Sequence, residues 1–122
     1  GNLLYIDSAN NVLIGKIDGY GIDYIDDISV LSNNEIILGG QFIKDINLNP
    51  IPGNPDEILT SNYPINNGSF HLTDGFIVKY DTLLNVYWKK KISSIGMDVI
   101  EDIETYGDKI YVCGSNYTFW KW

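Results

Sequence analysis

Short runs of apolar residues, each bounded by Asn, Asp, Gly or Ser, recur along the whole chain. The runs are rich in Ile, Val, Leu and Tyr and show no extended helical period, so they predict β-strands rather than helices. The polar turns between them favour antiparallel hairpins. The expected strands span residues 3–6, 12–17, 25–31, 35–42, 76–80, 86–92, 99–105, 109–114 and 119–122.

The chain contains an internal duplication. Gly1-Asn-Leu-Leu-Tyr-Ile-Asp7 recurs as Gly75-Phe-Ile-Val-Lys-Tyr-Asp81, a spacing of 75 minus 1, or 74 residues, and Thr118-Phe-Trp-Lys-Trp122 begins the pattern again. Tyr80 and Trp122 are 42 residues apart, which is typical of one four-stranded propeller blade. Further equivalent pairs are Asn11/Asn85, Val12/Val86 and Gly40/Gly114 at a spacing of 74, and Asp27/Asp102 and Ile28/Ile103 at 75.

This duplication predicts an all-β, β-propeller-like fold with two four-stranded antiparallel blades and the first strand of a third. The predicted boundaries are residues 1–42 for the first blade, 43–74 for an inserted connection, 75–117 for the second blade and 118–122 for the third. Two blades cannot close a ring, because a propeller needs about four or more. We therefore expect the chain to be a portion of a longer propeller, or copies of it to associate and complete one.

The inserted connection contains all four prolines and a series of oxygen-bearing side chains. Asp45, Asn47 and Asn49 are spaced two residues apart, and Asn54 and Asp56 follow them. Such spacing can direct several oxygens at one hard cation, so we predict a calcium site with Asp45, Asn47, Asn49 and Asp56 as metal ligands. A polar strand edge followed by a proline turn is the alternative. A melting transition that is the same with calcium and with chelator would contradict the calcium site.

The composition of the chain limits the classes of partner that it could bind. Sixteen acidic residues against eight lysines, with no arginine, give a net charge of −8, which disfavours nucleic acid as a partner. The basic run Lys89–Lys91 is expected along a strand, with alternate lysines on opposite faces. No run approaches the roughly 18 apolar residues that a membrane-spanning helix needs. Cys113 lies within an apolar run, where a buried position is expected.

Acidic residues cluster at the same place in both units. Glycosidases use carboxylate pairs, but recurrence in both units favours a structural role in which the carboxylates accept hydrogen bonds from turn amides. His71 is the single histidine, without zinc-ligand or Ser-His-Asp spacing around it, so we predict no catalytic residues and no enzyme. Trp88, Trp120 and Trp122 are expected to pack between blades. The acidic residues are Asp23, Asp26, Asp27 and Glu35 in the first unit, and Asp98, Glu101, Asp102 and Glu104 in the second.

Three segments of the second unit resemble the bacterial propeller repeat called SBBP. They are Asp74-Gly-Phe-Ile-Val-Lys-Tyr-Asp81, Asn85-Val-Tyr-Trp88-Lys and Asp108-Lys-Ile-Tyr-Val-Cys-Gly114. The first unit matches less well, because Tyr5 replaces the lysine and Ile14 the tryptophan of the pattern. A quinoprotein-type propeller repeat is the alternative, although no cofactor site accompanies it. The resemblance implies a β-propeller in a large secreted or surface protein, without shared catalytic residues.

These inferences indicate a non-catalytic structural or binding module of an extracellular, cell-surface or particle-surface assembly. Such a module would contact other protein chains, or further blades of the same protein, through loops such as residues 43–74. It would need no cofactor apart from the calcium considered above. A carbohydrate-binding, lectin-like propeller with a glycan as partner is the alternative, and it would require exposed aromatic side chains in a pocket.

Overall fold

A computed structural model of the chain describes residues 2–6, 9–10, 12–19, 21, 23–62 and 72–117. These residues form β-strands and turns without a helix, so no helix among them is long and apolar enough to cross a membrane. The strands are β1 (Asn2–Ile6), β2 (Val12–Lys16), β3 (Asp18–Gly19), β4 (Asp23–Val30), β5 (Ile36–Phe42), β6 (Asp45–Asn47), β7 (Ile58–Thr60), β8 (Asp74–Tyr80), β9 (Val86–Ile92), β10 (Met97–Tyr106) and β11 (Lys109–Tyr117).

The strands expected from the apolar pattern are present throughout the described residues. The predicted strand over 119–122 lies outside those residues, as do His71, Trp120 and Trp122. Three short strands were not predicted: β3 precedes β4, and β6 and β7 lie within the inserted connection. The insertion is therefore partly sheet, because its apolar residues Ile46 and Leu48 are buried against the body of the protein.

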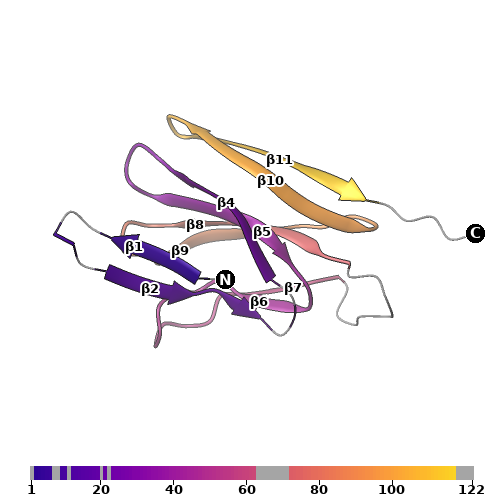
Figure 1. Cartoon of the computed structure of the whole chain (residues 1–122), viewed down its shortest axis with the longest axis horizontal. Coiled ribbons are helices and arrows are strands. Elements are labelled where there is room, and N and C mark those ends of the chain that lie inside the picture. Colours follow the sequence, from indigo (N-terminus) through magenta and orange to yellow (C-terminus); the bar gives the residue numbers. More distant parts are fainter. Residues whose placement is uncertain are drawn as a thin grey trace, which may run out of the picture.

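The strands form four antiparallel sheets. The largest has the order β4-β5-β8-β9 (Figure 1). A second sheet has the order β3-β6-β7, and the hairpins β1–β2 and β10–β11 form two separate two-stranded sheets. All pairings between neighbouring strands are antiparallel. The all-β, antiparallel class of the fold is thus confirmed.

The predicted grouping of the strands into two blades is wrong. The four-stranded sheet joins the last two strands of the predicted first blade to the first two strands of the second. The reason lies in β5 and β8, which are buried at nearly every position and therefore on both faces. Strands buried on both faces belong at the centre of a sheet. They pair with each other, although the inserted connection separates them in the sequence.

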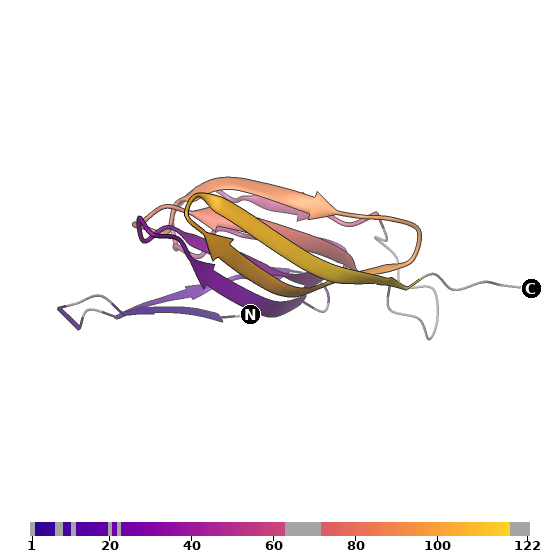
Figure 2. The ribbon, with the colours of Figure 1, turned by 90° about the horizontal axis from the view of Figure 1, so that it is seen from above.

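The four-stranded sheet has a hydrophobic core on each face. Aromatic and aliphatic side chains of β5 and β8 meet residues of β6 and its flanking segments on one face, while β10 covers the other. Figure 1 shows this order, with β10–β11 on one side of the sheet and β6–β7 on the other, and Figure 2 shows β1–β2 extending away from it. The first core contains Ile17, Ile36, Leu38, Phe42, Ile46, Leu48, Phe76, Val78, Tyr80 and Leu84, and the second contains Leu31, Ile37, Ile77, Ile100 and Ile103.

The internal duplication is visible in the backbone of β4–β5 and β10–β11. Each hairpin has a β-bulge at the equivalent place, between residues 25 and 27 and between residues 100 and 102. Gly40 and Gly114 lie beside these bulges. A Cβ added to Gly40 would lie 1.9 Å from a carbonyl oxygen of β4, and one added to Gly114 would lie 2.2 Å from a carbonyl oxygen of β10. Only glycine permits this close approach of the strands.

The other two hairpins, β1–β2 and β8–β9, share a turn conformation. Asn10 has a φ of 61° and Leu84, 74 positions later, has a φ of 64°. Asparagine adopts this left-handed conformation readily, whereas leucine does so at a cost. Leu84 is buried in the first core, and this burial offsets the cost.

Candidate functional site

The asparagine-rich part of the inserted connection is held by its own side chains. The Asn47 Oδ1 accepts hydrogen bonds from the backbone amides of Asn49 and Glu57, both at 3.0 Å. The Asn49 Oδ1 accepts from the Ile51 amide at 3.0 Å, while its Nδ2 donates to the Ile51 and Asn54 carbonyls. The loop between β6 and β7 is therefore ordered by hydrogen bonds to its backbone.

These contacts bear on the calcium hypothesis for Asp45, Asn47, Asn49 and Asp56. The Asn47 Nδ2 donates to the Asp56 Oδ1 at 2.7 Å, so the structure brings these two predicted ligands together. The amide oxygens of Asn47 and Asn49 already accept backbone hydrogen bonds. Within the described ranges, no three His, Cys, Asp or Glu side chains gather around one point where a metal could bind. The calcium site stays a prediction, and the contacts present are those of a hydrogen-bonded loop.

Asp74, a buried aspartate that was not predicted as a site residue, links the end of the inserted connection to the four-stranded sheet. Asp74 begins β8 and is fully buried. Its carboxylate accepts hydrogen bonds from the Ser61 Oγ at 2.8 Å, the Asn62 amide at 2.6 Å and the Ser93 Oγ at 2.8 Å. Three donors satisfy this carboxylate, as the burial of a polar group requires.

Two of the clustered carboxylates bind backbone amides. The Ser94 amide, in the turn before β10, donates to the Asp98 Oδ2 at 2.7 Å, which is the turn-capping role predicted from the sequence. The Ile103 amide of β10 donates to the Asp27 Oδ2 at 2.6 Å. Asp27 therefore links β4 to the hairpin packed on its sheet. This link between sheets was not predicted.

Two further carboxylates of the clusters, Glu35 and Glu101, contact polar side chains. Lys79 forms an ion pair with Glu35, and its hydrogen bond lowers the pKa of the Glu35 carboxyl. The Ser115 Oγ donates to the Glu101 Oε1 at 2.5 Å. Asp102 and Glu104 are exposed.

One oxygen of Asp23, like the Oε2 of Glu35, is buried without a hydrogen-bond partner, but the Glu35 oxygen has its ion pair with Lys79. Burial raises the pKa of Asp23 from 3.8 to about 6, and the charge of Asp18 adds to the rise. An acid whose pKa is higher in the folded state destabilises the fold as it ionises. Asp23 therefore lowers the free energy of unfolding as the pH rises from about 4 to about 6.

We expect Asp23→Asn to stabilise the protein at pH 7 by roughly 1 kcal/mol, after allowance for solvent screening, and to have little effect near pH 3.5. The neutral amide removes the cost of ionising Asp23 in the fold. Urea unfolding at both pH values measures the difference. Asp108→Asn, at an exposed turn position, is the control. Equal effects of the two substitutions across the pH range would contradict the assignment.

The lysine run of β9 alternates between faces, as predicted. Lys89 forms an ion pair with Glu57, and the Lys91 Nζ donates to the Thr60 carbonyl at 2.9 Å. Lys90, between them, lies over the Trp88 ring at 5.7 Å from its centroid. Trp88 is partly buried against the second core, so it has a packing role as predicted, although the prediction placed it between two blades.

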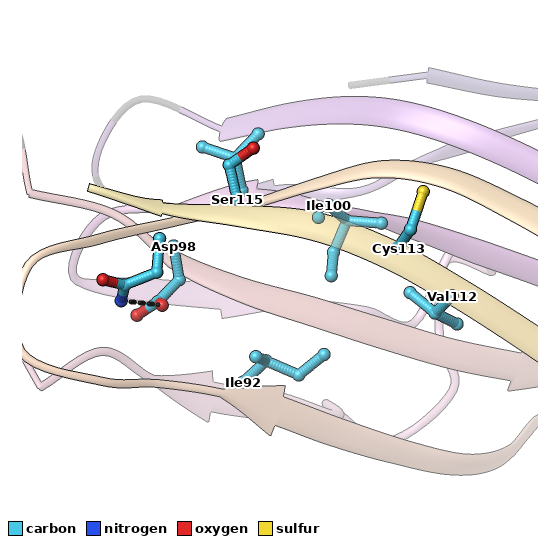
Figure 3. A pocket seen from close by; sticks show the side chains of 9 residues that line it. Ile92, Asp98, Ile100, Val112, Cys113 and Ser115 are labelled. Atoms are coloured by element: carbon cyan, nitrogen blue, oxygen red, sulfur yellow. Dashed lines mark hydrogen bonds between the residues drawn. The ribbon is translucent and has the colours of Figure 1, made fainter.

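A cleft of about 280 Å³ lies between β9 and the β10–β11 hairpin (Figure 3). Its apolar part is formed by residues such as Ile92, Ile100 and Val112. At its polar end the Asp98 Oδ1 accepts hydrogen bonds from the Asn116 Nδ2 at 2.9 Å and the Ser94 Oγ at 2.7 Å. The lining residues are Ile92, Asp98, Val99, Ile100, Val112, Cys113, Gly114, Ser115 and Asn116.

The prediction that Cys113 is buried is wrong. Cys113 is exposed on β11, and its sulfur points away from Ile92 on the far side of the cleft (Figure 3). Successive residues of a strand face opposite sides, and no further sheet covers the outward side of β11 within the described part of the chain. An apolar run thus predicted a strand correctly but not its burial.

Comparisons with protein families, with curated proteins and with solved structures found no match to this chain. The fold and the site together define an all-β antiparallel protein with an open cleft beside an exposed strand.

Proposed function

We propose that the chain is a non-catalytic module of an SBBP-type, β-propeller-like repeat array, and that it makes protein contacts within a secreted or surface assembly. A difference in burial between equivalent positions supports the proposal. Ile103 of β10 is 3% exposed because its side chain packs against the four-stranded sheet, whereas the equivalent Ile28 of β4 is 47% exposed. In an array, the sheet of the preceding repeat would cover Ile28, in the same way that the four-stranded sheet covers Ile103.

The opposite faces of the β4–β5 and β10–β11 hairpins show the same difference in burial. Ile37 of β5 is fully buried beneath β10–β11, while its equivalent Tyr111 on β11 is 56% exposed. Asp27 accepts a hydrogen bond from the Ile103 amide of β10, while its equivalent Asp102 is exposed. Repeats that contact only their neighbours leave one uncovered face at each end of the stack. The uncovered positions are those that a further sheet would bury.

The loop between β6 and β7 supports a role in protein contacts. Residues 52–56 are exposed, yet the side chains of Asn47 and Asn49 hold the adjoining backbone in place. A loop that is ordered before binding loses less conformational entropy when a partner docks. The inserted connection is thus suited to a contact role at the edge of the array.

The structure gives the carbohydrate-binding alternative no specific support. Sugar sites use aromatic faces, but the residues that line the cleft include no aromatic side chain. Trp88 packs against the second core. Exposed tyrosines such as Tyr24 and Tyr87 lie on different edge strands of the four-stranded sheet.

The array proposal predicts that two copies joined in tandem are more stable than one. We expect a head-to-tail fusion through a flexible Gly/Ser linker of about 15 residues to have a higher Tm than the single chain, because the joined copies bury a face that is open in each alone. Calorimetry measures the transition. The matched control is the same fusion carrying Ile28→Asp in the second copy, which places a charge at the new contact. An unchanged Tm in the unmodified fusion would contradict the array.

A further inference from the structure

The exposed sheet edges differ in how they are protected against pairing with another strand. β4 and β10 carry several acidic residues and a bulge, and β2 and β9 carry lysine. Charges and bulges at an edge oppose the addition of a further strand. β3 and β7 are only two and three residues long. In β11 the only charged residue is Lys109, at the start of the strand, and residues 110–117 contain neither a charged residue nor proline. Residues 2–6 of β1 contain neither as well.

The duplication identifies what each unprotected edge would bind. β11 is equivalent to β5, and β1 is equivalent to β8, at a spacing of 74 residues. In the four-stranded sheet, β5 and β8 pair with each other along their full length. The edge of β11 therefore corresponds to the edge through which β5 binds β8, and the edge of β1 corresponds to the edge through which β8 binds β5. In the described part of the chain, β1 pairs only with β2, and β11 only with β10.

We infer that β11 of one copy binds β1 of a second copy of this chain, as an added antiparallel strand in the register of β5 and β8. The inference rests on the proposed array and names its partner. Gly39 pairs with Ile77 and Leu38 with Val78 in the existing sheet. Shifting these pairs by the repeat spacing of 74 places Cys113 opposite residue 3 of the partner copy, and Val112 opposite residue 4.

Pairing of β1 with β11 would bury apolar surface in the cleft beside β11. Val112 lines the cleft, and its equivalent Leu38 is buried opposite Val78 in the four-stranded sheet. The incoming strand has leucine at position 4, opposite Val112. Burial of apolar groups supplies the favourable free energy, and the backbone groups along the two edges supply hydrogen bonds.

The β1 strand that binds β11 must belong to another copy rather than to the same chain. β10–β11 covers one face of the four-stranded sheet, whereas Gly15 of β2 lies against Pro50 on the side of the first core. Figure 1 shows the hairpins β1–β2 and β10–β11 on opposite sides of that sheet. Two different surfaces would thus meet, which makes the association head-to-tail and able to continue from copy to copy.

A cysteine at position 3 tests the register. We expect Leu3→Cys to form disulfides with Cys113 of neighbouring copies under mild oxidation, giving a ladder of dimers, trimers and larger species on a non-reducing gel. Pairing holds the two thiols at a high effective concentration, so the linkage should form about tenfold faster than between freely diffusing copies. Mass spectrometry of the linked peptides identifies the bond between positions 3 and 113.

Two variants control this experiment. Leu4→Cys moves the thiol to the opposite face of the strand from Cys113, so it should form the ladder at least about tenfold more slowly. Leu3→Cys combined with Cys113→Ser lacks one of the two thiols and should give no ladder. Equal rates for Leu3→Cys and Leu4→Cys, or bonds only between identical positions, would overturn the inferred register.

Sedimentation of the unaltered chain provides a measurement that needs no substitution. We expect species heavier than the monomer, and more of them at high salt, because each copy carries a net charge of −8 that salt screens. A monomer at all concentrations and both salt levels would overturn the inference. If the tandem fusion is stabilised while separate copies stay monomeric, only the pairing between copies fails. If the fusion gains no stability either, the proposed array fails as well.

Discussion

Phe76→Ala is expected to destabilise the protein by about 3–5 kcal/mol, a large part of the roughly 5–15 kcal/mol that holds a typical domain folded. Phe76 is fully buried at the centre of β8, and its ring meets the edge of Phe42 with centroids 6.1 Å apart. It also covers Gly40, which has no side chain to fill the space that the ring would leave. The alanine variant would therefore contain a cavity.

Urea unfolding followed by tryptophan fluorescence measures this effect. Leu83→Ala is the control, because Leu83 is 72% exposed in the turn between β8 and β9 and should cost no more than about 0.5 kcal/mol. Similar losses for the two variants would show that β8 is not the centre of the sheet. A loss confined to Phe76→Ala would support the pairing of β5 with β8.

Ile103→Ala is expected to cost about 2–4 kcal/mol, because this residue is buried where β10 packs on the four-stranded sheet. The equivalent substitution Ile28→Ala should cost less than about 1 kcal/mol, because Ile28 is 47% exposed. The two residues are the same amino acid at equivalent positions of the repeat. Their difference therefore measures the stabilisation that one sheet receives from the next.

The tandem fusion extends this comparison. Ile28 of the second copy would become covered, so Ile28→Ala in that copy should become more costly than in the single chain. Equal costs for Ile103→Ala and Ile28→Ala in the single chain would contradict the packing of β10 on the sheet.

The apolar pattern was sufficient to locate most strands, but it could not determine which strands share a sheet. β5 and β8 are each bordered by turn residues, and a 42-residue unit predicted that the strands before the insertion would pair among themselves. The information that decides the pairing is the burial of both faces of these strands. Uninterrupted apolar sequences such as Ile36-Ile-Leu38 and Phe76-Ile-Val78 indicate burial of both faces. The spacing of the repeat alone does not reveal this.

The candidate sites were predictable only in part. The turn-capping role of Asp98 followed from its recurrence in the repeat, because turn amides are frequent partners of aspartate. The cleft was not predictable, since it depends on the separation of β9 from β10–β11 rather than on any motif. The open edge of β11 did have a signal, the absence of charge over residues 110–117, which is meaningful only once the strand is known to lie at an edge.

The long insertion between β5 and β8 has a consequence for the order of folding. The turns within β4–β5 and β8–β9 are short, so these hairpins can form early, on a microsecond timescale. The central β5–β8 pairing must instead bring together strands that are separated by residues 43–73. Closing that loop adds an entropic barrier. We expect formation of the β5–β8 pairing to limit the folding rate. Until it forms, the two hairpins would have their apolar faces exposed to solvent.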